Sequence, residues 1–179
     1  MVDFSNIKQK ILDITKDYPD FPKKGILFHD VLPIFNHPKL VQELCEKIAE
    51  NYRGKVDAVA GLEARGFLLG PQVSINLGVP FVPIRKKGKL PGETIHATYK
   101  KEYGEDIIEI QKNVLPPHSR VLLVDDLLAT GGTLKAAFDL LKTAQCDAGE
   151  AFVLVELTGL KGREVLNGAT VKSLITYEF

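Results

Sequence analysis

VLLVDDLLATGGT, residues 121–133, joins an apolar run to two carboxylates and then to a loop of small residues. The apolar run predicts a buried strand over 120–124. Asp125 and Asp126, called the acid pair below, follow it directly, and a helix is expected to begin at Thr133 and to run to Thr143. In a doubly wound sheet, ligands bind at the carboxyl ends of the strands. The sequence therefore predicts a ligand site at this junction.

Strands and helices alternate along the chain on both sides of this junction. Short apolar runs bounded by turn residues predict strands at 56–60, 79–84, 150–157 and 171–177, and a helix is expected over 67–77. Such alternation favours a parallel sheet that is covered on both faces. We therefore predict an α/β fold with a doubly wound, mainly parallel sheet and helices on both faces.

Two segments lie outside this alternation. Residues 94–111 predict two strands joined by a polar tip at 101–105, a candidate flap. The first part of the chain predicts an amphipathic helix that begins at Ser5 and a second helix from about Pro38 to Tyr52. The sequence has no internal repeat and no composition break, so a single domain is expected over residues 1–179.

The charges of the chain balance. Lys+Arg and Asp+Glu both number 23, so the net charge gives no reason to expect a nucleic-acid partner. Any polyanionic ligand must therefore be held by a local cluster of basic residues. No apolar run approaches the roughly 18 residues of a membrane span, and no signal-peptide pattern opens the sequence. We expect a cytoplasmic protein without a membrane partner. Cys45 and Cys146 form no C-x-x-C pair and are interpreted as buried thiols.

The loop after the acid pair has the chemistry of a phosphate cradle. Gly131 and Gly132 allow close approach of the backbone and positive φ, while Thr130 and Thr133 add hydroxyl donors at the beginning of a helix. A P-loop needs a lysine at position 132, and a dinucleotide fingerprint needs G-x-G-x-x-G; the sequence has neither. Residues 129–133 are called the phosphate loop below.

The acid pair indicates which kind of phosphate compound the site binds. Adjacent carboxylates would repel a phosphate unless they face other groups, and sugar hydroxyls are the natural donors to them. The junction therefore indicates a site for a ribose 5-phosphate. The alternative is an acidic strand end and a glycine-containing helix start that bind no ligand.

At this point the sequence resembles a known family. The acid pair and the phosphate loop are similar to the phosphoribosyl pyrophosphate (PRPP) signature of the type I phosphoribosyltransferases, and the resemblance covers nearly the whole chain. Other motifs are similar to the members that use adenine: Phe21-Pro22 with Gly25 to Phe28, Gly61 to Phe67, Arg85 to Gly92, Glu102-Tyr103-Gly104 and Glu156-Leu157-Thr158.

The resemblance implies a role for each part of the sugar site. Asp125 and Asp126 would hold the ribose hydroxyls, and Arg65 would contact the pyrophosphate. Lys86 and Lys89, from the densest basic run of the chain, would assist Arg65. Without the resemblance, these segments would be an ordinary strand-to-helix connection and a solvated basic turn. The 5-phosphate would be bound by Ala129, Thr130, Gly131, Gly132 and Thr133.

The base subsite depends more strongly on the resemblance. By residue type alone, Phe28 is a core phenylalanine and Leu157 is the inward end of a strand. The resemblance implies instead that these two side chains sandwich adenine, while the backbones of Leu27 and His29 read the edge of the base. Residues 1–35 would then contribute to a hood over the base.

The resemblance also implies a catalytic role for the polar tip of residues 94–111. Glu102 would handle a proton on adenine, and Tyr103 would contact the phosphate end of the substrate. The implied activity is transfer of the phosphoribosyl group of PRPP to N9 of adenine, giving AMP and pyrophosphate. Mg²⁺, held mainly by the substrate rather than by a protein metal site, and a homodimer are implied as well.

Two other functions remain open on the sequence. A phosphoribosyltransferase for hypoxanthine or guanine would use the same sugar site. Activity assays with each base would distinguish this enzyme from one that uses adenine. A non-catalytic regulator of the same fold would bind PRPP and control a nucleic acid, but such a protein is expected to have a basic face that this charge balance does not provide.

Overall fold

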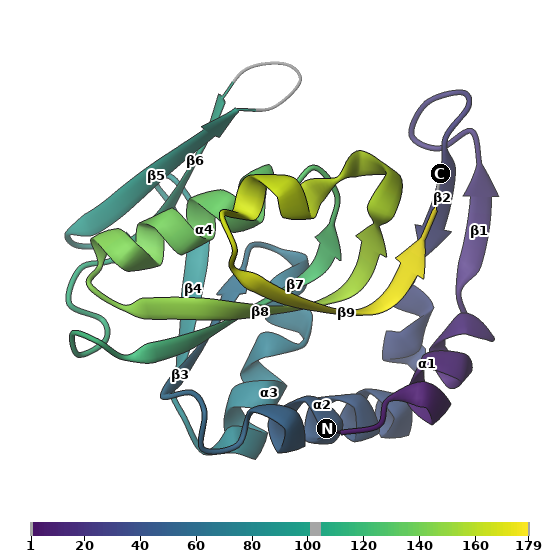
Figure 1. Cartoon of the computed structure of the whole chain (residues 1–179), viewed down its shortest axis with the longest axis horizontal. Helices are drawn as coiled ribbons and strands as arrows, with labels where there is room; N and C mark the ends of the chain where they lie inside the picture. The colour runs from purple at the N-terminus through teal and green to yellow at the C-terminus, as the bar shows by residue number, and fades with distance from the viewer. Residues whose placement is uncertain (1, 101–104, 179) are drawn as a thin grey trace. The chain divides into compact units, whose positions relative to one another are not determined.

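The computed structural model describes residues 2–100 and 105–178, and the chain divides into two compact units, Met1–Asn51 and Tyr52–Phe179 (Figure 1). The first unit contains α1 (Ser5–Leu12), α2 (Pro38–Tyr52, which ends one residue into the second unit) and an antiparallel hairpin of β1 (Lys16–Pro19) and β2 (Leu27–Asp30). Ile7 and Ile11 are buried, as the amphipathic pattern predicts. The predicted second helix agrees with α2 at both ends.

The second unit is built around one sheet of seven strands in the order β5-β6-β4-β3-β7-β8-β9. The pairs β4–β3, β3–β7, β7–β8 and β8–β9 are parallel, whereas β5 and β6 form an antiparallel hairpin that joins the edge of β4. A mainly parallel sheet is therefore confirmed. The strands are β3 (Ala58–Leu62), β4 (Phe81–Lys86), β5 (Thr94–Lys100), β6 (Glu105–Gln111), β7 (Arg120–Leu128), β8 (Asp147–Leu157) and β9 (Thr170–Tyr177).

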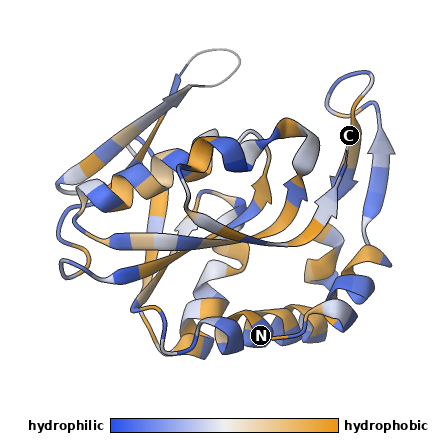
Figure 2. Ribbon diagram, in the orientation of Figure 1, coloured by the Kyte–Doolittle hydropathy of each residue, from blue (hydrophilic) through white to orange (hydrophobic). Residues whose placement is uncertain are grey.

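Helices α3 (Gly70–Leu77) and α4 (Gly132–Thr143) cover opposite faces of this sheet (Figure 1). Alternate residues of β4 point to opposite faces. Val82 and Ile84 belong to the same apolar cluster as the buried side chains of α4, whereas Phe81 packs against Gly70 of α3. Apolar residues accordingly follow the central strands in Figure 2.

Several boundaries differ from the sequence prediction. β4 is displaced by two residues, to Phe81–Lys86, and β8 begins three residues earlier, at Asp147. Three further differences lie close to the site. β7 runs on to Leu128, because residues 125–128 keep pairing with 153–156 of β8, so the acid pair lies inside the strand and not after its end. β3 is displaced by two residues and ends at Leu62. The predicted helix over 67–77 is divided into a 3₁₀ turn, Arg65–Leu68, and α3, where Pro71 occupies the first turn.

The strand order sets the position of the site. From β3 the chain crosses to β4 on one side, while β7, β8 and β9 follow one another on the other side. The β3–β7 boundary is therefore a topological switch point, and the crevice at the carboxyl ends of such strands is where open α/β sheets bind ligands. Within the described residues, no helix has the length and apolarity that crossing a membrane requires.

Candidate active site

A pocket of about 280 Å³ opens at the carboxyl ends of β3 and β7, within the second unit. It gathers four segments that are distant in the sequence: the turn after β3, the end of β4, the last part of β5, and the junction between β7 and α4. The residues that line it are Glu63, Ala64, Arg65, Lys86, Tyr99, Asp125, Asp126, Leu127, Leu128, Ala129, Thr130, Gly131, Gly132, Thr133 and Leu134.

The phosphate loop contributes backbone donors to this pocket. Gly131 has φ +81°, a left-handed conformation that favours glycine, and α4 begins directly after it. Gly132 is the first residue of the helix and is not among the residues with positive φ, so only one of the two glycines uses the conformation predicted for both. No side chain caps α4, so its first-turn N–H groups face the pocket as donors for an anion.

Asp126 is buried and Asp125 is partly buried next to the phosphate loop. The backbone N–H of Asp126 donates to Oδ1 of Asp125 at 2.9 Å, and Oδ2 of Asp126 lies 2.8 Å from Nη1 of Arg65. Burial raises the pKa of both carboxyls, and for Asp125 the charge of Asp126 raises it further. Arg65 opposes this increase in both groups. Further donors, such as sugar hydroxyls, would stabilise the charged forms of both carboxyls.

Arg65 is held by the backbone that follows it. Gly66 is buried, and a Cβ there would overlap the carbonyl oxygen of Val124 in β7. This close approach brings the turn after β3 directly against the strand that carries the acid pair. The side chain of Arg65 is 42% exposed, so it remains accessible to a ligand.

The basic run from Arg85 to Lys89 begins inside β4, which ends at Lys86, and its members have different partners in the structure. Arg85 donates from Nε and Nη2 to Glu63 at 3.0 and 3.2 Å, so its charge is paired within the chain. Lys86 lines the pocket, with Nζ 3.9 Å from Oδ2 of Asp106. Lys89 is not among the lining residues; its backbone N–H donates to the buried Glu109 at 2.9 Å. Of the two predicted lysines, the structure places Lys86 in the pocket.

Tyr99 is a lining residue that the sequence reasoning missed. Its hydroxyl donates to Oδ2 of Asp106 across the β5–β6 hairpin at 3.2 Å. The same carboxylate lies near Lys86, so Tyr99 and Lys86 converge on one acceptor at the side of the pocket. The only sequence signal for Tyr99 was its position in a strand of the predicted flap.

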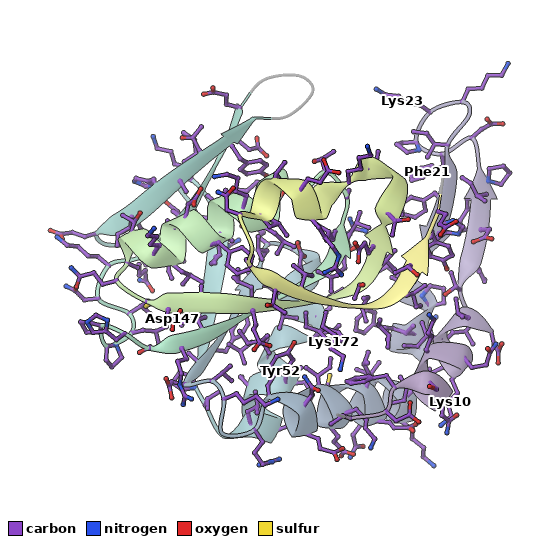
Figure 3. The ribbon with its side chains drawn as sticks, viewed as in Figure 1. Lys10, Phe21, Lys23, Tyr52, Asp147 and Lys172 are labelled. Carbon is purple, nitrogen blue, oxygen red and sulfur yellow. The ribbon has the colours of Figure 1, made fainter. Side chains whose placement is uncertain are left out.

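The predicted base-binding residues lie in both units. Leu27, Phe28 and His29 form most of β2 in the first unit, and Leu157 ends β8 in the second. Phe28 is half-buried and packs edge-on against Phe21, which is labelled in Figure 3, with ring centroids 5.0 Å apart. The sandwich of adenine between Phe28 and Leu157 stays a prediction.

The side chain of His29, to which the sequence assigned no role, has a partner in the hairpin. Its Nδ1 lies 2.6 Å from Oδ1 of Asp17 on β1, in the cross-strand position. Glu102 and Tyr103 lie outside the described residues, so their predicted roles also stay predictions.

Two larger hollows lack comparable chemistry. One, of about 650 Å³, lies between α1 and the start of α2 in the first unit, and the other, of about 560 Å³, lies beside the end of α4. Neither contains a helix N-terminus with free donors beside a buried carboxylate pair. The smaller pocket at the switch point is therefore the candidate active site.

The donor set suits a magnesium ion that a substrate brings with it. Among the described residues, no three His, Cys, Asp or Glu side chains group to hold a metal. Mg²⁺ is commonly bound by one or two carboxylates together with substrate phosphates, and the acid pair supplies two carboxylates next to the phosphate loop.

Known proteins share both this sequence and this architecture. Residues 31–170 match the family model described as the phosphoribosyl transferase domain. The chain belongs to the phosphoribosyltransferase family. The resemblance noted in the sequence is thus confirmed, and the doubly wound fold agrees with it.

The relatives named here are adenine phosphoribosyltransferases. The protein of Caenorhabditis elegans is 58% identical over 178 residues, which cover 98% of this chain and 96% of that protein. The Saccharomyces cerevisiae structure, complexed with an imino-altritol bisphosphate and adenine, superposes with a TM-score of 0.90 at 47% identity, covering 95% of this chain and 99% of that one. A Trypanosoma brucei structure in complex with AMP, pyrophosphate and ribose-5-phosphate gives 0.86 at 29% identity, covering 95% and 79%.

Proposed function

We propose that this chain transfers the phosphoribosyl group of PRPP to N9 of adenine and forms AMP and pyrophosphate in purine salvage. The observation that carries the proposal is the pocket at the switch point, where the acid pair, Arg65 and the phosphate loop meet. The 58% identity with an adenine phosphoribosyltransferase supports the choice of base.

The phosphate loop binds the 5-phosphate of the sugar. The uncapped N–H groups at the beginning of α4 and the hydroxyls of Thr130 and Thr133 donate to its oxygens, and the positive end of the helix dipole favours the anion. Ala129, Gly131 and Gly132 have no long side chain that would obstruct the approach of the phosphate to the backbone.

The acid pair binds the ribose hydroxyls. Hydrogen bonds from hydroxyls to a carboxylate stabilise its charged form, so the sugar lowers the pKa values that burial has raised. Breaking the anomeric C–O bond develops positive charge on the ribose and negative charge on the departing pyrophosphate. The carboxylates of Asp125 and Asp126 oppose the first charge, and Arg65 and Lys86 bind the second.

Mg²⁺ would accompany PRPP and be held mainly by oxygens of the substrate, with the carboxylates of Asp125 and Asp126 beside it. When bound, it neutralises part of the pyrophosphate charge. Lys89 assists from the basic turn after β4.

Adenine is held between Phe28 and Leu157, and the backbones of Leu27 and His29 read its edge. Backbone donors and acceptors distinguish the exocyclic amine of adenine from a 6-oxo group. Residues 94–111 close over the bound substrates and exclude water, which would otherwise hydrolyse the activated sugar. Glu102 handles the proton of the base, and Tyr103 contacts the phosphate end.

The enzyme works as a cytoplasmic homodimer. Leu68 and Ile75, seven residues apart on the 3₁₀ turn and α3, expose 45% and 70% of their surface. Exposed apolar side chains on two consecutive helical segments are consistent with an interface, and a second copy of this chain would cover them.

The test is to incubate the chain with adenine, PRPP and Mg²⁺ and to measure AMP by liquid chromatography. AMP is expected with adenine, and hypoxanthine and guanine should react at least about a hundredfold more slowly, because the base-reading backbone would leave unpaired groups with a 6-oxopurine. Faster turnover of hypoxanthine or guanine would identify the alternative enzyme. PRPP binding without turnover of any base would favour a regulator.

A further inference from the structure

The phosphate loop touches a distant turn through two glycines. A Cβ on Gly131 would overlap the carbonyl oxygen of Gly162, and a Cβ on Gly162 would overlap the carbonyl oxygen of Ala129. The same Cβ on Gly162 would lie 3.0 Å from the backbone nitrogen of Gly131. The two backbones are therefore in direct contact, and Gly162 limits where residues 129–131 can lie.

The turn that carries Gly162 is anchored by the next residue. Arg163 donates from Nε and Nη2 to the two carboxylate oxygens of Glu156 at 2.7 and 2.6 Å, and from Nη1 to the carbonyl oxygen of Val171 at 2.8 Å. Ser173 donates to Oε2 of Glu156 at 2.6 Å. This arrangement ties the turn to two neighbouring strands, β8 and β9.

Glu156 is well placed to serve as the fixed point. It is 5% exposed, and its backbone lies opposite Leu128, the residue directly before the phosphate loop. The hydrogen bonds from Arg163 lower its pKa, so it remains a carboxylate at neutral pH. A bidentate pair between arginine and carboxylate fixes orientation as well as distance.

We propose that Arg163, Glu156 and Ser173 are positioning residues that hold Gly162 against the phosphate loop and thereby keep the loop shaped for a 5-phosphate. None of the three lines the pocket. The inference rests on the proposed function in taking the 5-phosphate of PRPP as the ligand. Its physical basis is that a site made of backbone donors depends on supporting contacts that hold the backbone to within about 0.5 Å.

The first test replaces the anchor. Arg163→Ala should raise the KM for PRPP by about tenfold or more, with a smaller change in kcat and in the KM for adenine, because a misplaced loop weakens phosphate binding first. The KM of Arg163→Lys for PRPP should lie between those of the wild type and Arg163→Ala. One ammonium group cannot make both bonds to the Glu156 carboxylate and the bond to the carbonyl oxygen of Val171.

The control is an arginine pair with the same bidentate geometry, but with a more exposed carboxylate, at the other end of β7. Arg120 donates from Nε and Nη2 to Asp57 at 3.0 and 2.7 Å, near Asp147 at the beginning of β8 (Figure 3). Arg120→Ala should lower the melting temperature without changing the KM for PRPP. An equal rise in this KM for both variants would mean that the effect is general destabilisation, and would overturn the proposal.

A second pair of variants tests the contact itself. Gly162→Ala should raise the KM for PRPP because the new Cβ collides with backbone atoms of the phosphate loop. Gly149→Ala is the control: it adds the same methyl group in β8, where nothing lies within 4 Å. Unchanged PRPP kinetics in Gly162→Ala would also overturn the proposal.

Calorimetric titration with ribose 5-phosphate gives a readout independent of turnover. Arg163→Ala should weaken its binding. Ser173→Ala removes one hydrogen bond to Glu156 and one from Arg163 but leaves the Arg163–Glu156 pair, so it should weaken binding less; the Ser173 variant also serves if Arg163→Ala does not fold. Wild-type binding in both Arg163→Ala and Ser173→Ala would refute the positioning role even if the wild type makes AMP. Weakened binding without any AMP from the wild type would support the positioning role while the proposed function fails.

Discussion

Asp125 and Asp126 place two carboxyl groups side by side in a buried stretch of β7. The folded chain pays for this arrangement, because burial and mutual repulsion both disfavour the charged forms. Arg65 compensates Asp126 directly through its ion pair. Arg65 makes this ion pair with Asp126 and not with Asp125. We therefore expect the carboxylate of Asp125 to lower the stability of the fold while it serves the function of the site.

We predict that Asp125→Asn makes the chain more stable and less active. At neutral pH the melting temperature should rise by roughly 3 °C, the shift that about 1 kcal/mol produces in a chain of this size. The kcat/KM for PRPP should fall at least tenfold, about 1.4 kcal/mol, because the sugar loses a charged acceptor. Thermal denaturation and steady-state kinetics measure the two effects, and unchanged kinetics would contradict the assigned role.

The stability gain should depend on pH in a defined direction. The pKa of Asp125 is raised in the folded chain, so the folded state holds its proton to a higher pH than the unfolded state. Wild-type stability therefore falls as pH rises from the ordinary aspartate pKa through the raised pKa. The advantage of Asp125→Asn should be full above this interval and should shrink as pH falls through it; a gain that stays constant down to acid pH would refute this explanation.

Glu102 has a separate prediction at the same scale. If it handles a proton of adenine, Glu102→Gln should lower kcat by about a hundredfold, within the range typical of general acid–base catalysis, and should change the affinity for adenine much less. Steady-state kinetics would measure kcat, and calorimetric titration would measure the affinity for adenine. A large loss of affinity with kcat preserved would remove Glu102 from the catalytic residues.

At the scale of elements, β7 is the strand on which the site depends. It carries the acid pair, leads into the phosphate loop and, through the carbonyl of Val124, receives the turn that bears Arg65. The close approach of Gly66 to Val124 leaves no room for a side chain, and the atoms it would meet are backbone atoms that cannot move aside cheaply.

We predict that Gly66→Ala affects both stability and the position of Arg65. Overpacking of this kind costs about 2 kcal/mol, which corresponds to a fall of roughly 5 °C in melting temperature. The kcat/KM for PRPP should fall by about tenfold as Arg65 moves away from the pyrophosphate. Gly149→Ala, with open space around the new methyl group, should change neither quantity, and wild-type behaviour of Gly66→Ala would show that the contact is dispensable.

At the scale of the whole molecule, association is the property to measure. The chain has a mass of 19.8 kDa, and sedimentation should give twice this mass if Leu68 and Ile75 meet a second copy. Ile75→Lys should shift the species toward the monomer, because an unpaired charge at an apolar interface is costly. Val114→Lys, which alters another exposed apolar residue, should leave the mass unchanged. A wild-type monomer at micromolar concentration would refute the dimer.

Much of the fold was predictable because its signals are local. Apolar runs, glycine turns and helical periodicity identify β4, β8, β9, α2 and α4 from neighbouring residues alone. The same holds for part of the site: the acid pair and the phosphate loop are contiguous in the sequence, and parallel strands bring their carboxyl ends to one edge. Arg65 follows β3 and Lys86 is the last residue of β4, and the structure places both in the same pocket.

The sequence by itself thus determined the layers, the edge of the sheet where ligands bind, and the chemistry of the phosphate loop. Only the tertiary structure decided that β7 continues through the acid pair, because pairing with β8 fixes where a strand ends. It also decided that Arg65 pairs with Asp126, that Tyr99 joins the pocket, and that Gly162 supports Gly131. These contacts join segments far apart in the chain, and no local pattern of residues encodes which of them will meet.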